Sequence, residues 1–127
     1  MKIRQIIPLV LISTMVITMV ACGGNETHIN VQEDQLYGLW RKNNTQEYWR
    51  YKSDGTGVTW DEGDNITEEE SNLTYSWTIN GDRLTHVFTG AQGNQAVPKV
   101  YTVTEISSTS MQWKDDYSME YSLTKVN

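Results

Sequence analysis

Residues with the types and spacing for catalysis are few in this chain of 127 residues. A serine nucleophile would need a histidine base. His86, however, lies in an alternating Leu-Thr-His-Val-Phe segment, where we expect a hydrogen-bonded residue of the interior or the rim. The sixteen Asp and Glu residues allow many carboxylate pairs for glycoside hydrolysis, and nothing selects one of them. We therefore expect no enzymatic activity and no catalytic residue.

Metal ligands are the second kind of chemistry to consider. Acidic residues gather between positions 61 and 70, and their oxygen atoms could bind calcium. The segment lacks the Asp-x-Asp-x-Asp-Gly spacing of a preformed calcium loop, so a solvated charged loop is the simpler interpretation. Zinc is less favoured still, because the chain holds only His28, His86 and one cysteine. No metal and no cofactor is expected.

The single cysteine, Cys22, follows a segment with the features of a secretory signal. Lys2 and Arg4 form a basic start, residues 6–20 carry no charge, and Ala21 places a small residue before the cysteine. The apolar run is shorter than the ~20 residues that cross a bilayer, although a retained signal-anchor is an alternative. We predict a signal peptide over residues 1–21.

This N-terminal arrangement resembles a bacterial lipoprotein signal. The resemblance implies cleavage after Ala21, a lipid on Cys22, and anchoring in the bacterial cell envelope, at the outer membrane, with the periplasmic or surface face left open. Residues 22–35 are mostly polar and aperiodic, which predicts a flexible tether. The remaining residues, 36–127, are expected to form one domain.

The charge balance excludes some partners. Removal of residues 1–21 takes two basic residues and no acidic one, which leaves eight basic against sixteen acidic residues. A chain this acidic is not expected to bind nucleic acid, whose phosphates need basic partners, or to dock on anionic lipid. Membrane association would depend on the lipid at Cys22, and we expect the domain to be a monomer.

From Leu36 onward the pattern of apolar residues has a period of two, which indicates half-buried antiparallel strands. Asn80-Gly81-Asp82 and Ser53-Asp54-Gly55 predict tight hairpin turns. Eight strands are expected, one around Trp40 and the others over residues 47–52, 56–61, 73–79, 83–89, 100–106, 111–113 and 119–123.

Short connections between neighbouring strands predict an all-β fold, an eight-stranded antiparallel up-and-down barrel, with a sandwich as the alternative. Two connections are longer, one between Trp60 and Leu73 and one over residues 90–95. If strands alternate in direction, both lie at the same end of the barrel, which would be its open mouth. The tight turns at 53–55 and 80–82 would then lie at a closed end.

Three motifs carry a resemblance to a known family: Gly38-Leu39-Trp40-Arg41, Asp54-Gly55-Thr56-Gly57, and Trp77-Thr78-Ile79-Asn80-Gly81-Asp82-Arg83-Leu84. In this order and spacing they resemble the lipocalins, and more closely the short lipocalin-like lipoproteins of Bacteroidetes. The resemblance spans about residues 36–126 and implies a ligand-binding barrel. It also implies that Trp40 packs across the closed end under a basic residue of the last strand, for which Lys125 is the only candidate.

Seventeen large residues are expected to share the interior face, among them all five tryptophans: Trp40, Trp49, Tyr51, Val58, Trp60, Leu73, Tyr75, Trp77, Ile79, Leu84, Phe88, Tyr101, Val103, Met111, Trp113, Tyr121 and Leu123. An eight-stranded barrel is only wide enough for side chains to fill it or for one small ligand. A filled aromatic core and a core with a pocket therefore remain two alternatives.

If there is a pocket, the residues nearest the open end would line it: Trp60, Leu73, Tyr75 and Phe88. Trp and Tyr offer broad apolar faces with a polar atom, which suits an amphipathic guest or a sugar ring. The leading interpretation is a non-catalytic binder of a small hydrophobic or amphipathic ligand. The alternative is a filled barrel whose loops contact another envelope protein or a glycan.

Overall fold

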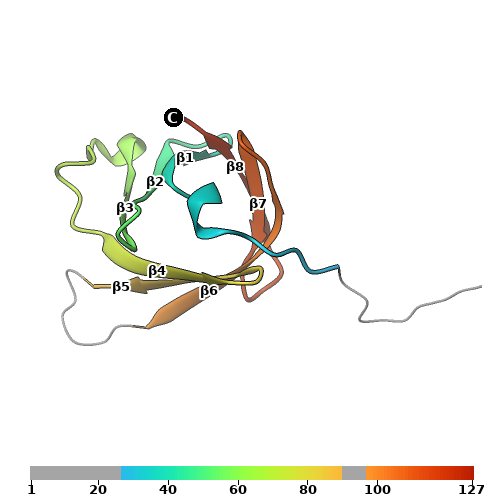
Figure 1. Ribbon diagram of the computed structural model, residues 1–127. Coiled ribbons are helices and arrows are strands. Elements are labelled where there is room, and N and C mark those ends of the chain that lie inside the picture. The colour runs from blue at the N-terminus through green and yellow to red at the C-terminus, as the bar shows by residue number, and fades with distance from the viewer. Residues whose placement is uncertain (1–26, 90–96) are drawn as a thin grey trace, which may run out of the picture.

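The computed structural model of the chain describes residues 27–89 and 97–127. Eight antiparallel strands form a closed barrel in sequence order, which confirms the predicted up-and-down topology (Figure 1). The last strand pairs with the first and closes the barrel. The elements are η1 (Glu33–Gln35), β1 (Gly38–Lys42), β2 (Glu47–Tyr51), β3 (Thr56–Asp61), η2 (Glu62–Asp64), β4 (Thr74–Asn80), β5 (Arg83–Phe88), β6 (Pro98–Ile106), β7 (Ser110–Lys114) and β8 (Glu120–Lys125).

Strand β4 shows how the sequence pattern becomes structure. Successive side chains of a strand point to opposite faces, and here Tyr75 and Trp77 are buried while Thr74 and Thr78 are exposed. The strand ends in the predicted hairpin turn, where Gly81 has a φ of 66°, a conformation that L-residues with a side chain seldom adopt. The turn pairs residues 75–80 of β4 with residues 83–88 of β5 in one continuous register.

The two ends of the barrel differ as predicted for the connection between Trp60 and Leu73, whereas the second predicted open-end connection, residues 90–95, lies outside the described residues. The pairing of Tyr75 with Phe88 places the start of β4 and the end of β5 at one end. The connection 62–73, which contains η2, lies at this open end and is on the left in Figure 1. The turns at 53–55 and 80–82 lie at the opposite, closed end.

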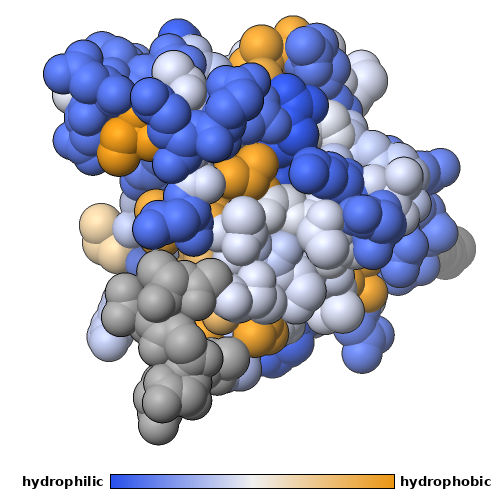
Figure 2. Space-filling model, turned by 90° about the vertical axis from the view of Figure 1, so that its left-hand side faces the viewer, coloured by the Kyte–Doolittle hydropathy of each residue, from blue (hydrophilic) through white to orange (hydrophobic). Residues whose placement is uncertain are grey.

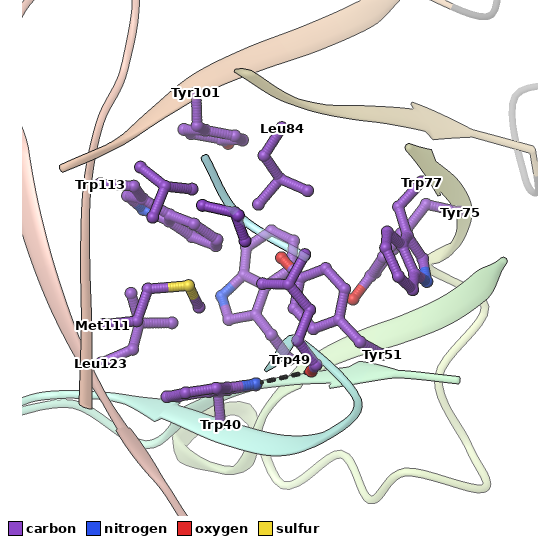
Figure 3. Packing of buried hydrophobic residues seen from close by; sticks show 13 residues of the cluster. Trp40, Trp49, Tyr51, Tyr75, Trp77, Leu84, Tyr101, Met111, Trp113 and Leu123 are labelled. Atoms are coloured by element: carbon purple, nitrogen blue, oxygen red, sulfur yellow. Dashed lines mark hydrogen bonds between the residues drawn. The ribbon is translucent and has the colours of Figure 1, made fainter. Parts of the chain in front are cut away.

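Buried side chains fill the middle and the closed end of the barrel (Figure 3). The cluster among the described residues consists of Val31, Leu36, Trp40, Trp49, Tyr51, Tyr75, Trp77, Leu84, Tyr101, Val103, Met111, Trp113 and Leu123. Trp40 has no exposed surface, and its Nε1 donates a hydrogen bond of 2.9 Å to the carbonyl oxygen of Leu36. The filled-core alternative thus describes this part of the interior.

The predicted interior face is wrong at two positions of β3, Val58 and Trp60. The turn at 53–55 pairs Tyr51 with Gly57. Directly opposite residues share a face of the sheet, so Gly57 and the residues two and four positions later face the interior. Val58 and Trp60 face outward.

Val58 and Trp60 are nevertheless buried, because the outer face has an apolar cluster of its own with Leu39. The Trp60 ring stacks on Tyr48, with ring centroids 5.3 Å apart. The alternation of apolar residues in β3 correctly indicated a strand, but these residues belong to its outer face. A one-residue change of register moves every side chain of a strand to the opposite face of the sheet.

The flexible tether predicted over residues 22–35 ends earlier than position 35. Val31 and Leu36 are buried in the core cluster. The Val31 amide donates a 2.8 Å hydrogen bond to the carbonyl oxygen of Gly81, and His28 Nδ1 lies 2.6 Å from Asp82 Oδ2. Apolar residues spaced this far apart in a polar run give no period, so the sequence pattern did not show that the segment closes the barrel end.

The predicted signal peptide and the predicted lipid-modified Cys22 lie outside the described residues. Within the described ranges, none of the helices combines the length and the apolar character needed to cross a membrane.

Candidate functional site

A pocket of about 570 Å³ lies at the open end of the barrel. Its inner wall consists of Trp49 from β2, Phe88 from β5 and Tyr101 from β6, and its outer wall includes Ile66 and Leu73 from the connection 62–73. Figure 2 is a view onto this end, where hydrophobic surface in orange is exposed between hydrophilic loops. The pocket therefore joins the aromatic interior to the solvent.

The pocket forms where β3 and β4 part. Their ladder covers only residues 56–58 and 74–76. Beyond it, the connection 62–73 runs beside β3 and is held by side-chain contacts: Ser71 Oγ donates a 2.6 Å hydrogen bond to the Thr59 carbonyl oxygen. On the outer face, the Arg50 guanidinium donates two hydrogen bonds to the Glu68 carboxylate. These contacts position the outer wall of the pocket.

Three of the four predicted binding residues, Trp60, Leu73 and Phe88, line this pocket. Trp60 does so from the outer face of β3 rather than from the interior, and Leu73 is half exposed. Tyr75 does not line the pocket. It is buried in the core, and its hydroxyl donates a 2.8 Å hydrogen bond to the carbonyl oxygen of Arg50.

The pocket lining also includes residues that were not predicted as binding residues, among them Glu47, Trp49, Lys99 and Tyr101. Each of these four follows or precedes an open-end connection and faces inward. Counting the register outward from the turn at 53–55 would have shown that Glu47 and Trp49 face inward near the open end. For Lys99 the signal was weak, because a lysine at the start of a strand is usually solvent exposed.

Carboxylates dominate the charged lining of the pocket. Glu47, Asp61, Asp64 and Glu70 contribute to it, and Lys99 is its basic residue among the described part of the chain. The indole Nε1 of Trp49 donates a 2.8 Å hydrogen bond to Glu47 Oε2. This bond fixes a carboxylate at the edge of an aromatic wall.

The pKa of Tyr101, in the inner wall of the pocket, is raised by its surroundings. Burial, followed by the negative charges of Glu47 and Asp115, raises the pKa of Tyr101 to about 12. Its ring stacks on Trp113 with centroids 4.6 Å apart. The Tyr101 hydroxyl is thus neutral at physiological pH in an environment that disfavours a further negative charge.

His86 lies behind the aromatic wall and has no exposed surface. Its Nε2 is 2.7 Å from the Tyr51 hydroxyl, its ring stacks on Trp49, and its Nδ1 has no hydrogen-bond partner among the described residues. Burial, and secondly the charge of Lys99, lowers the pKa of His86 to about 3. A neutral histidine with so low a pKa is a poor general base at neutral pH.

The low pKa of His86 predicts a loss of stability in mild acid. Below its usual pKa of about 6.5 the unfolded chain binds a proton that the folded chain excludes, so the free energy of unfolding falls by about 1.4 kcal/mol per pH unit. We expect a loss of about 2 kcal/mol between pH 7 and pH 5 in urea denaturation experiments. The variant His86→Gln should lose this dependence.

An equal loss in both proteins would contradict that assignment. The carboxyl pKa values of Asp54 and Asp115 are also lowered. For Asp54 the main cause is its hydrogen bonds with Thr56, and for Asp115 hydrogen bonds outweigh the opposing effect of desolvation. Both carboxyl groups therefore also lose stabilisation in acid. They do so only as the pH falls through the ordinary Asp range near 4, below the window proposed for the measurement.

The fold and the pocket can be compared with known proteins. A family model described as a lipocalin-like domain matches residues 17–113, which is more than half of the chain. This chain belongs to the lipocalin-like domain family. No curated protein and no solved structure matches it. The match ends in β7, and β8 completes the lipocalin-like barrel by pairing with β1. Lipocalin-like proteins are in general non-catalytic binders of small ligands.

At the closed end of the lipocalin-like barrel the structure brings Trp40 and Lys125 together. The two residues are direct partners in the β1–β8 ladder, and Lys125 Nζ lies 4.7 Å from the centroid of the Trp40 ring. Gly38, two residues before Trp40, has a φ of 125°. A Cβ at this position would lie 2.7 Å from Lys125 Cε and 2.6 Å from the backbone oxygen of Asn127. The Gly-x-Trp motif thus has a structural reason: the lysine stem crosses the glycine to reach the indole.

The described residues of this lipocalin-like chain contain no group of three or more His, Cys, Asp or Glu side chains arranged to hold a metal ion. The acidic residues of 61–70 are instead distributed along the connection. Asp61 Oδ1 accepts a hydrogen bond from the Gly63 amide, and Glu70 Oε1 accepts one from the Thr67 amide.

Proposed function

We propose that this lipocalin-like protein is a non-catalytic binder of a small hydrophobic or amphipathic molecule, which it holds in the open-end pocket. The observation that carries the proposal is the pocket of about 570 Å³ with Trp49, Phe88 and Tyr101 as its inner wall. This volume lies in the range typical of small-molecule sites. Because the core below is filled, the ligand would lie at the mouth rather than deep in the barrel.

The lining suits an amphipathic ligand in particular. Aromatic side chains form the inner wall, whereas charged side chains of the connection 62–73 and of β2 form the rim. An apolar body can be removed from water against the aromatic faces, and polar groups at the rim then fix its orientation.

We also propose that the protein acts at the bacterial cell envelope, anchored in the outer membrane through a lipid on Cys22, as in the lipoproteins of Bacteroidetes. The support is the sequence around the cysteine: a basic start, an uncharged apolar run and a small residue before Cys22. Metabolic labelling with a radioactive fatty acid should mark the protein, and Cys22→Ala should remove the label. Unlabelled wild-type protein would contradict the anchor.

An uncharged fluorescent probe tests the binding function. We expect the purified protein to bind N-phenyl-1-naphthylamine saturably, with increased probe fluorescence. Leu73→Ser should weaken binding about fivefold, because it removes about 1 kcal/mol of apolar contact in the pocket. Met119→Ser is the matched control: Met119 is also exposed at the open end, but it does not line the pocket. Equal effects of the two substitutions would contradict the assigned site.

A second candidate function is supported by a different observation. Val97, Tyr117 and Met119 are large apolar residues at the open end that are more than half exposed. Such a rim could contact another envelope protein or a glycan. Failure of the folded protein to take up the probe, together with loss of partner binding in Tyr117→Ser, would favour this candidate.

A further inference from the structure

The charge of the pocket points to the class of its ligand. Asp61 faces inward from β3 directly opposite Glu47 of β2. Like charges on directly opposite positions of two strands destabilise the sheet. Asp64 and Glu70 add two carboxylates to the same lining. The barrel thus holds a negative pair at its mouth that a positive charge in the pocket would stabilise.

Cations of the chain itself neutralise this lining only in part. Lys42 Nζ lies 3.5 Å from Glu47 Oε1, on the side of a smaller neighbouring pocket of about 120 Å³. Asp61, by contrast, forms no ion pair with any residue of the ranges 27–89 and 97–127. Lys99 lines the pocket from β6, where its charge lowers the pKa of His86.

The mouth already contains one example of the expected binding mode. The Lys42 ammonium that contacts Glu47 also lies over the Tyr121 ring, 4.3 Å from its centroid. A carboxylate beside an aromatic face therefore holds an ammonium group in this barrel. The larger pocket repeats these elements, because Glu47 is hydrogen bonded to the edge of Trp49 and Asp61 lies across the strand pair. Aromatic faces attract cations most strongly where water is excluded.

We propose that the ligand of the open-end pocket is an organic cation with an apolar body, an amphipathic amine whose ammonium group lies beside Asp61 and Glu47. This inference rests on the proposed binding function and names the class of ligand. The apolar body would contact Trp49, Phe88 and Tyr101. An organic cation fits better than a metal ion, since the described carboxylates are not grouped as metal ligands. An anionic amphiphile would place its charge against the carboxylates of the rim.

Three ligands with the same ten-carbon chain test this inference: decyltrimethylammonium, decyl sulfate and uncharged decanol, each titrated calorimetrically into the purified protein. We expect the cation to bind at least about tenfold more tightly than the anion, with the alcohol between them. Added salt should weaken binding of the cation and leave that of the alcohol unchanged, because salt screens charge interactions.

Asp61→Asn is the decisive variant, because asparagine keeps the oxygen that accepts the Gly63 hydrogen bond and removes only the charge. It should weaken binding of decyltrimethylammonium about fivefold and leave decanol unaffected. Glu69→Gln is the matched control, since Glu69 carries the same charge in the connection that follows Asp61 and does not line the pocket.

Three results would overturn the inference. If decyl sulfate binds as tightly as the cation, or if Asp61→Asn and Glu69→Gln behave alike, the charge of the pocket does not select the ligand, although the binding function stands. If none of the three ligands binds and N-phenyl-1-naphthylamine is also not taken up, the proposed function itself fails and the inference with it.

Discussion

Trp40→Ala should lower the free energy of unfolding by about 3–5 kcal/mol, the range for truncating a fully buried large aromatic residue. Trp40 has no exposed surface, and its Nε1 is hydrogen bonded to the Leu36 carbonyl oxygen. The substitution removes the side chain that joins the packed N-terminal segment to the closed end of the barrel. Urea denaturation followed by far-ultraviolet circular dichroism measures the change.

Lys125→Met separates packing from charge at the same place. Methionine keeps much of the stem that crosses Gly38 and removes the ammonium over the indole, so a loss of only about 0.5–1 kcal/mol is expected. Trp40→Phe should give an intermediate loss and covers the case in which Trp40→Ala does not fold. A loss below about 1 kcal/mol for Trp40→Ala would contradict the role of this residue in closing the barrel.

Gly57→Ala should be the most damaging substitution of its size, with a loss of about 3 kcal/mol. A Cβ at Gly57 would lie 2.3 Å from the Arg50 carbonyl oxygen and 2.4 Å from the ring of Tyr75. The backbone oxygen cannot move away without breaking the β2–β3 ladder, and Tyr75 is held by its own hydrogen bond to that oxygen. Thermal and urea denaturation both measure the effect.

Gly55→Ala is the control for Gly57→Ala. Gly55 lies in the preceding turn with a φ of 87°, and nothing lies within 4 Å of a Cβ placed there. It should cost only the backbone strain of a left-handed alanine, about 1 kcal/mol. If the two variants lose the same stability, the close approach of Tyr75 to Gly57 does not constrain the interior of the barrel.

Local sequence pattern was sufficient for most of the fold. The strict alternation in residues 73–79 and the glycine in the turn at 80–82 each point to the same hairpin, and the structure contains it. The strand pairing of neighbours follows because short turns leave no length for a crossover. The eight strands and the two ends of the barrel were therefore predictable without any long-range information.

The sequence pattern failed at β3, where the apolar residues belong to the outer face and the interior positions are glycine or polar residues. Val58 and Trp60 show the alternation of a strand. The interior positions of β3, however, hold Gly57, Thr59 and Asp61, and a hydrophobicity pattern does not predict such residues in the interior. Gly57 makes room for the Tyr75 ring, and Asp61 faces the pocket. The polar interior positions are thus those that a tertiary contact or the binding site requires, and neither is visible in a local pattern.

The candidate site was predicted as a location more than as a set of residues. The open end and three lining residues followed from the direction of the strands. Tyr75 was wrongly assigned to the pocket: it lies only two residues after Leu73, but this step along the chain leads from the rim of the pocket into the core. The carboxylates of 61–70 were assigned to a solvated loop. Their part in the pocket depends on where the connection 62–73 folds against β3, which charge and spacing do not determine.

The central claim is that the ligand occupies the open-end pocket, and the indole N–H resonances of the protein test it directly. Trp49 and Trp60 line the pocket, whereas Trp40 and Trp77 lie at the closed end. We predict that titration with N-phenyl-1-naphthylamine shifts the indole signals of Trp49 and Trp60 in two-dimensional nuclear magnetic resonance spectra and leaves those of Trp40 and Trp77 in place. Shifts confined to Trp40 and Trp77, or no shift at any tryptophan of the folded protein, would contradict it.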